Sequence, residues 1–137
     1  MKQVFADTGY WIAILDPKDT LHIKAKDVSE KLEEVIIVTS EMVLVEFANY
    51  FAGKGKNFRE MAIKTINNIR SNPNVVVIQQ TSLQFQSALE LYSSHKDKEW
   101  SLTDCASIHT MREQNIEEIL AHDQHFIQAG FKSLLRT

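Results

Sequence analysis

The chain has 137 residues, of which 44% are hydrophobic and 24% charged, with a formal net charge of −3. This length accommodates one hydrophobic core, and the ordinary composition excludes collagen-like, disordered and low-complexity proteins. The acidic balance excludes a protein that binds nucleic acid through a uniformly cationic surface, because such proteins are basic. We therefore expect one domain spanning residues 1–137.

Cysteine content and hydropathy exclude further classes of protein. The single cysteine, Cys105, excludes an intrachain disulfide framework and a cysteine-rich zinc site. No apolar run approaches the about 18 residues of a membrane span. The N-terminal segment lacks the charged-then-apolar order of a signal peptide. These features predict a cytoplasmic protein without a membrane segment.

Strand-like and helix-like segments alternate along the chain, by the period of their apolar residues and by their capping residues. The expected strands cover residues 3–6, 35–38, 75–78 and 119–121, with a fifth at 133–135. The expected helices cover residues 8–15, 20–34, 41–51, 58–70, 81–94 and 101–114, with a short one around Phe126.

The predicted strands are apolar runs without polar alternation, which is typical of a parallel sheet covered on both faces by helices. We expect an α/β fold, a three-layer α/β/α sandwich with a central, mainly parallel sheet of four to five strands. Ligand sites in open sheets of this kind form at the carboxyl ends of the strands. Residues that directly follow a strand are therefore the candidates for function.

Three aspartates lie at such positions. Asp7 follows the first strand, Asp123 follows the fourth, and Asp104 lies in the first turn of the helix after Trp100. Each also suits a helix N-terminus, where a carboxylate accepts backbone N–H groups. Asp104 completes the capping-box pattern that starts at Ser101. For any one aspartate alone, capping is the simpler interpretation.

Glu46 is different, because it interrupts an apolar stretch in the middle of a predicted helix. A carboxylate there is either solvated or buried beside a cation or with a proton. Four carboxylates converging on one sheet edge would repel one another unless a divalent cation lay between them. Mg²⁺ and Mn²⁺ prefer oxygen ligands and polarise phosphoryl oxygens. The set therefore predicts phosphodiester hydrolysis, and bound cations would let an acidic protein hold a polyanion.

Four fragments carry a family resemblance: VFADTGYWIAIL, MVLVEFANYF, WSLTDCASIHTM and ILAHDQHFIQAGF. In this order they resemble the PIN-domain family and, within it, the single-domain VapC-type toxins. The resemblance implies a PIN-like fold and an endoribonuclease that depends on Mg²⁺ or Mn²⁺, the toxin of a type II toxin–antitoxin pair. It implies a homodimer that is silenced by a small antitoxin protein covering the site.

The resemblance also implies roles for individual residues. The catalytic and metal-binding acids are Asp7, Glu46, Asp104 and Asp123, and Thr103 supports them by hydrogen bonding. The chain departs from the family at three positions. The family often has serine where Gly9 stands, threonine where Ala121 stands and an acid where His125 stands.

Candidate substrate contacts lie outside the acids. Lys54, Lys56 and Arg59 form the best basic patch for an RNA backbone, although a solvated helix connection explains them equally well. Trp100 lies on the loop before a predicted helix and is a candidate for base stacking. His125 is placed to contact a phosphate or the leaving group, with a surface or capping role as the alternative.

Two other functions remain open. One is another Mg²⁺-dependent phosphoryl hydrolase. Haloacid-dehalogenase-type phosphatases need a second aspartate where Gly9 stands, and receiver domains need adjacent acids and a late lysine that this sequence lacks. The other is a non-catalytic α/β binding module whose acids are helix caps. Divalent-ion binding that depends on the acids distinguishes these possibilities.

Overall fold

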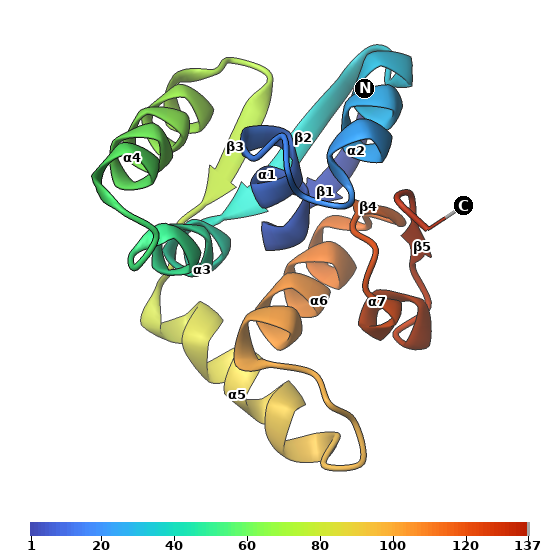
Figure 1. Cartoon of the computed structure of the whole chain (residues 1–137). Coiled ribbons are helices and arrows are strands. Elements are labelled where there is room, and N and C mark those ends of the chain that lie inside the picture. Colours follow the sequence, from blue (N-terminus) through green and yellow to red (C-terminus); the bar gives the residue numbers. More distant parts are fainter. Residues whose placement is uncertain (137) are drawn as a thin grey trace.

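A parallel sheet of five strands forms the centre of the computed structural model, which describes residues 1–136 (Figure 1). The strands are β1 (Lys2–Ala6), β2 (Val35–Ser40), β3 (Val75–Ile78), β4 (Glu118–Leu120) and β5 (Lys132–Ser133). The helices in the described part are α1 (Thr8–Leu15), α2 (His22–Lys31), α3 (Glu41–Phe51), α4 (Lys56–Ser71), α5 (Ser82–Ser94), α6 (Leu102–Gln114) and α7 (Gln124–Gln128).

The strand order β3-β2-β1-β4-β5 places the first strand in the middle of the sheet. Its register pairs Phe5 with Val38 on one side and with Ile119 on the other, and every pairing is parallel. The chain moves outward from β1 to β3 and then returns to the far side of β1. Because parallel crossovers are right-handed, this reversal puts α1–α4 and α5–α7 on opposite faces. The predicted α/β sandwich with a parallel sheet is confirmed.

Capping residues explain why several predicted helices begin where the structure has them. The Ser40 hydroxyl accepts the Val43 N–H (3.2 Å) at the start of α3. Ser101 and Asp104 form a reciprocal capping box at the start of α6, with both N···O distances at 3.0 Å. Asn115, in the left-handed region with φ 58°, ends α6.

Some predicted bounds are wrong, for local reasons. The helix expected over residues 20–34 covers only His22–Lys31. The Asp19 carboxylate accepts the Leu21 N–H (2.9 Å), which holds a turn where the helix was expected to begin. Helix α4 begins at Lys56, two residues earlier than expected, directly after Gly55 at φ 102°. Strand β4 starts one residue early, and β5 occupies 132–133.

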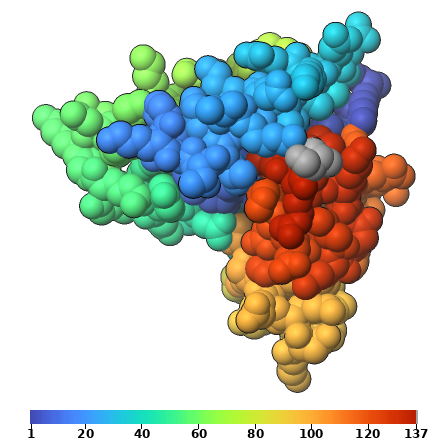
Figure 2. Space-filling view, turned by 45° about the vertical axis from the view of Figure 1, so that its right-hand side comes forward, coloured from blue at the N-terminus to red at the C-terminus, as the bar shows by residue number. Residues whose placement is uncertain are grey.

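One buried apolar cluster joins the sheet and helices, with fully buried phenylalanines at positions 5, 47, 51 and 126. Helix α5 packs against α6, and α5 with the loop that follows it projects from the rest of the molecule (Figures 1 and 2). None of the described helices has the length and apolar character needed to cross a membrane.

Candidate active site

The strand order reverses between β1 and β4, and two of the predicted acids follow these two strands. Asp7 comes directly after β1, and Asp123 follows β4. The Asp7 N–H donates to the Leu120 carbonyl (3.2 Å), which holds the two strand ends together. In open parallel sheets, ligands bind in the crevice at such a switch point.

A pocket of about 710 Å³ lies at this edge of the sheet, and all four predicted acids line it. Asp7 comes from the β1–α1 junction and Glu46 from α3. Asp104 comes from the first turn of α6 and Asp123 from the N-cap of α7. Four elements that are far apart in the sequence therefore deliver one carboxylate each to the same cavity.

The surroundings of Asp7 distinguish a helix-capping role from a role in the acidic pocket. It occupies the N-cap position of α1, yet its side chain makes no capping hydrogen bond. Burial raises the pKa of its carboxyl from 3.8 to about 7; the carboxylates of Asp104, Glu46 and Asp123 add to the rise, and the Thr8 backbone N–H opposes it. A half-buried carboxyl that lies near three others and does not cap its helix is poorly explained by helix stability.

Asp104 and Asp123 combine capping with a place in the pocket. Asp104 Oδ2 accepts the Ser101 N–H (3.0 Å), and Asp123 Oδ1 accepts the His125 N–H (3.1 Å). The imidazole of His125 lies between these carboxylates, with Nδ1 2.8 Å from Asp104 Oδ2 and 3.3 Å from Asp123 Oδ1. Because an ionised carboxylate only accepts hydrogen bonds, Nδ1 carries the proton in this contact.

The donor set of the pocket consists of oxygens suited to a hard divalent cation. Besides the carboxylates, the pocket is lined by Thr8, whose buried hydroxyl has no hydrogen-bond partner among the described residues. Within residues 1–136, no three His, Cys, Asp or Glu side chains are grouped closely enough to form a metal cage as they stand. Mg²⁺ commonly uses one or two carboxylates and keeps several waters. The residues present therefore fit such an ion.

The other predicted site residues are spread more widely. Thr103 lines a separate cavity of about 250 Å³ beside Glu46, and no hydrogen bond from its hydroxyl to a carboxylate occurs in the described part of the chain. The Lys54 ammonium lies 4.6 Å from the ring centroid of Tyr50, and Tyr50 itself lines the acidic pocket.

Lys56, Arg59 and Trp100 do not line the acidic pocket. Lys56 is exposed at the start of α4, and the Arg59 guanidinium donates to the Ala52 carbonyl (3.1 Å). Trp100 is buried, with its indole N–H donated to Gln128 Oε1 (3.0 Å) and its ring packed against His95.

Several residues that line the pocket were missed from the sequence, among them Thr8, Tyr50 and Arg136. Arg136 is exposed, and its guanidinium donates to the His122 carbonyl (2.9 Å) at the edge of the acids. No motif marks Arg136, because its place depends on how the chain returns after β5. Thr8 directly follows the first acid, so its position next to Asp7 was the available signal.

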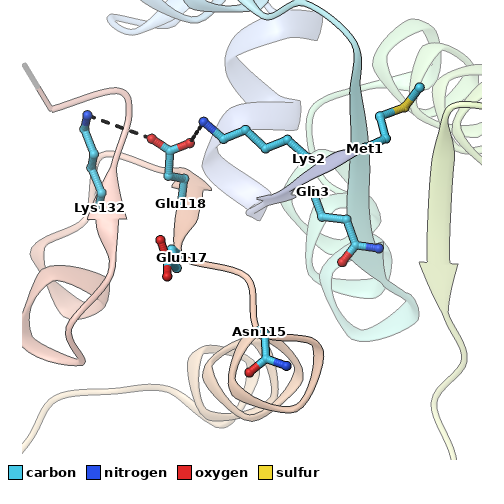
Figure 3. A pocket seen from close by; sticks show the side chains of 7 residues that line it. All are labelled: Met1, Lys2, Gln3, Asn115, Glu117, Glu118 and Lys132. Atoms are coloured by element: carbon cyan, nitrogen blue, oxygen red, sulfur yellow. Dashed lines mark ion pairs between the residues drawn. The ribbon is translucent and has the colours of Figure 1, made fainter.

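A different pocket, of about 500 Å³, lies among the residues that begin β1, β4 and β5 (Figure 3). Glu118 lies between Lys2 and Lys132, pairing with both ammonium groups; Lys132 Nζ is 3.8 Å from Glu118 Oε2. These ion pairs link three neighbouring strands at their starts. None of the predicted site residues lines this pocket.

Comparison with known proteins identifies related sequences. The model of the PIN domain family matches residues 4–132. The 23S rRNA-specific endonuclease VapC20 of Mycobacterium tuberculosis is 28% identical over 128 residues, covering 93% of this chain and 95% of VapC20. The same match is found with VapC20 from two strains of that species.

Two solved structures are also similar to this chain. The crystal structure of M. tuberculosis VapC20, described as a sarcin–ricin loop cleaving toxin, superposes with a TM-score of 0.84 at 27% identity, over 93% of this chain and 95% of that one. FitAcB from Neisseria gonorrhoeae shares the fold, with a TM-score of 0.65 at 13% identity over 95% of each chain. The fold and the acidic pocket at the switch point define an α/β protein of the PIN type. The chain belongs to the PIN domain family.

Proposed function

We propose that this protein is an endoribonuclease that hydrolyses RNA phosphodiester bonds with the help of Mg²⁺ or Mn²⁺. The observation that carries the proposal is the convergence of Asp7, Glu46, Asp104 and Asp123 on one pocket, where the half-buried Asp7 side chain makes no capping hydrogen bond. Family membership and the likeness to an rRNA endonuclease support the choice of RNA over other phosphate esters.

The four acids are proposed to hold the cation. Asp7 is the central ligand, because it faces the other three, and Asp104 and Asp123 are held in position by their capping hydrogen bonds. The bound ion would supply positive charge and Lewis-acid polarisation of the phosphoryl oxygen. Thr103 is proposed to support Glu46 from the neighbouring cavity that both residues line.

Cations around the pocket are proposed to bind the RNA backbone. Arg136 lines the acidic pocket at the edge beside His122, and Lys54 is held over Tyr50, which lines the same pocket. Lys56 and Arg59 would contact RNA farther from the scissile phosphate, since both flank the loop that carries Lys54.

His125 and Trp100 are proposed to act on substrate binding mainly through neighbours. His125 orients Asp104 through its 2.8 Å contact and presents its second ring nitrogen to a phosphate. Trp100 packs behind His95 and stabilises the loop next to the pocket.

The cellular role is proposed to be that of a toxin in a type II toxin–antitoxin pair, acting in the cytoplasm as a single-domain homodimer that a small antitoxin protein silences. Exposed apolar side chains on α5, namely Leu83, Phe85 and Leu89, support a protein-contact surface. The 23S rRNA specificity of VapC20 makes large-subunit rRNA the first substrate to test.

The test is cleavage of 23S rRNA in purified ribosomes and of the isolated sarcin–ricin loop, with Mg²⁺ or Mn²⁺ and with EDTA. We expect wild-type protein to cut only with metal, and Asp7→Asn and Asp104→Asn to be inactive while keeping their circular dichroism spectra. Glu60→Gln, which removes an exposed carboxylate from α4, is the matched control and should cut normally.

Full activity in either aspartate variant would refute the assignment of the acids. Wild-type protein that binds Mn²⁺ and RNA but cuts neither substrate points to a different RNA. Wild-type protein that does not bind Mn²⁺ at all leaves the non-catalytic binding module as the better explanation.

A further inference from the structure

A second cavity adjoins the acidic pocket and has a different character. It has a volume of about 370 Å³ and lies between the end of α5, the loop of residues 95–101 and the start of α6. Its lining includes the rings of Tyr92, His95 and Trp100 and the lysines at positions 96 and 98. This loop and the end of α5 project from the rest of the molecule in Figure 2.

Two rings of its aromatic wall, those of His95 and Trp100, are held in place before any ligand arrives. The His95 ring lies on the Trp100 ring, with centroids 4.9 Å apart and planes tilted by 31°. His95 Nδ1 donates a hydrogen bond to the Leu91 carbonyl (3.1 Å), and the Trp100 indole N–H donates to Gln128 Oε1. Tyr92 lies one helical turn before His95 and is 51% exposed. Rings fixed in this way lose little side-chain freedom when a planar ligand stacks on them.

The cavity lies next to the acidic pocket, and the two share part of their lining. Glu99 and Ser101 line both cavities, and Ser101 also caps the helix that carries Asp104. A strand with one phosphate at the acids can therefore place a neighbouring group over this wall. Two successive nucleotides of one strand can therefore occupy the acidic pocket and this cavity.

The charges favour a base over a bare phosphate as the bound group. Lys96 has no ion pair among the described residues, whereas Lys98 Nζ lies 3.4 Å from Asp97 Oδ2. With Glu99 in the wall, the local charge is balanced. A neutral heteroaromatic ring in this cavity can stack on the aromatic side chains. The Glu99 carboxylate can accept hydrogen bonds from its N–H groups, and the Ser101 hydroxyl can donate or accept.

We infer that this cavity binds an unpaired nucleobase of the RNA substrate, next to the phosphate held at the acids. The inference rests on the proposed function for the identity of the polymer. Tyr92 and His95 stack on the base, Glu99 and Ser101 contact its edge, and Lys96 contacts the backbone outside. Such a site selects single-stranded or flipped-out nucleotides, because a paired base cannot enter the cavity.

The test is a titration of the wild-type protein with AMP, CMP, GMP and UMP, with ribose 5-phosphate as the probe that lacks a base. Binding is followed by the amide NMR signals of residues 92–101 in EDTA, so neither metal nor cleavage is needed. We expect saturable shifts with at least one nucleotide and none with ribose 5-phosphate. Tyr92→Ala should weaken binding at least about fivefold, and Tyr92→Phe should keep it within about twofold of wild type.

Phe85→Ala removes another exposed ring of α5 that does not line the cavity, and it should bind like wild type. Equal shifts with ribose 5-phosphate, no saturation up to about 10 mM nucleotide, or unchanged binding by Tyr92→Ala overturns the inference. A separate cleavage assay distinguishes the two proposals, since absence of cleavage in wild type counts against the nuclease alone. With an RNA that is cut, Tyr92→Ala should raise KM and leave kcat nearly unchanged.

Discussion

Replacing Asp7 by asparagine should stabilise the metal-free protein at neutral pH, although it removes a proposed catalytic group. Burial and three nearby carboxylates raise the pKa of Asp7 from 3.8 to about 7 in the folded state. At 1.36 kcal/mol per pH unit, that difference corresponds to about 4 kcal/mol. The native site is thus unfavourable for the ionised carboxylate, and asparagine keeps the shape without the charge.

The sign of the pH dependence follows from the raised pKa. Below pH 3.8 the carboxyl is protonated in both the folded and unfolded states, so Asp7 does not lower the free energy of unfolding. Between pH 3.8 and about 7 the unfolded state releases its proton first, and the free energy of unfolding falls as pH rises. The advantage of Asp7→Asn should therefore grow from about 2 kcal/mol at pH 5 to about 4 kcal/mol at pH 8.

The assay is urea denaturation in EDTA at pH 5, 6, 7 and 8, followed by circular dichroism. Asp97→Asn, on an exposed loop, is the control and should shift the free energy of unfolding little at any pH. An advantage of Asp7→Asn that is the same at pH 5 and pH 8, or a variant less stable than wild type at pH 8, would refute the electrostatic reasoning.

Three further outcomes are expected from the pocket. Saturating Mn²⁺, at 100 times its Kd, should stabilise wild type by about 2.7 kcal/mol, or roughly 10 °C in Tm, and Asp104→Asn should lose this shift in differential scanning fluorimetry. His125→Asp introduces the acid that the family often has at this position. In EDTA the added negative charge should lower the free energy of unfolding by about 1 kcal/mol, and with Mn²⁺ the Tm of the variant should rise more steeply than that of wild type. Equal Mn²⁺ responses of the two proteins contradict this. Gly9→Ser should raise the free energy of unfolding by about 0.5 kcal/mol in urea denaturation, because serine has a higher helix propensity than glycine. A Cβ at this position meets no atom within 4 Å, so a loss of stability would contradict this prediction.

Much of the fold could be predicted because local signals agree with the final packing. The bounds of α3 and α5 follow from Ser40 and Thr81, whose side chains accept backbone N–H groups at the helix starts. The error at α2 has a local cause as well. Asp19 bonds to the amide two residues later, and this turn competes with the helix that a capping aspartate would start.

The site was partly predictable, and for a physical reason. Parallel strands all end at the same edge, so acids after β1 and before α7 had to lie near each other once the strand order was known. The sequence could not place Thr103, since a small rotation of α6 decides which cavity its hydroxyl lines. Nor could it place Arg136, whose position depends on the return of the chain after the two-residue strand β5.

The position of β1 in the centre of the sheet also affects when the pocket forms during synthesis of the protein. Phe5 pairs with Ile119, so the junction that carries Asp7 has no neighbour on one side until β4 has been made. At about 5–20 residues per second, β4 follows β1 out of the ribosome on the order of 10 s later, and closing so long a loop is slow. A nascent chain that already contains Asp7, Glu46 and Asp104 thus lacks the completed pocket. The proposed nuclease is therefore inactive while it is being translated, and it gains activity only after its C-terminal strands have folded.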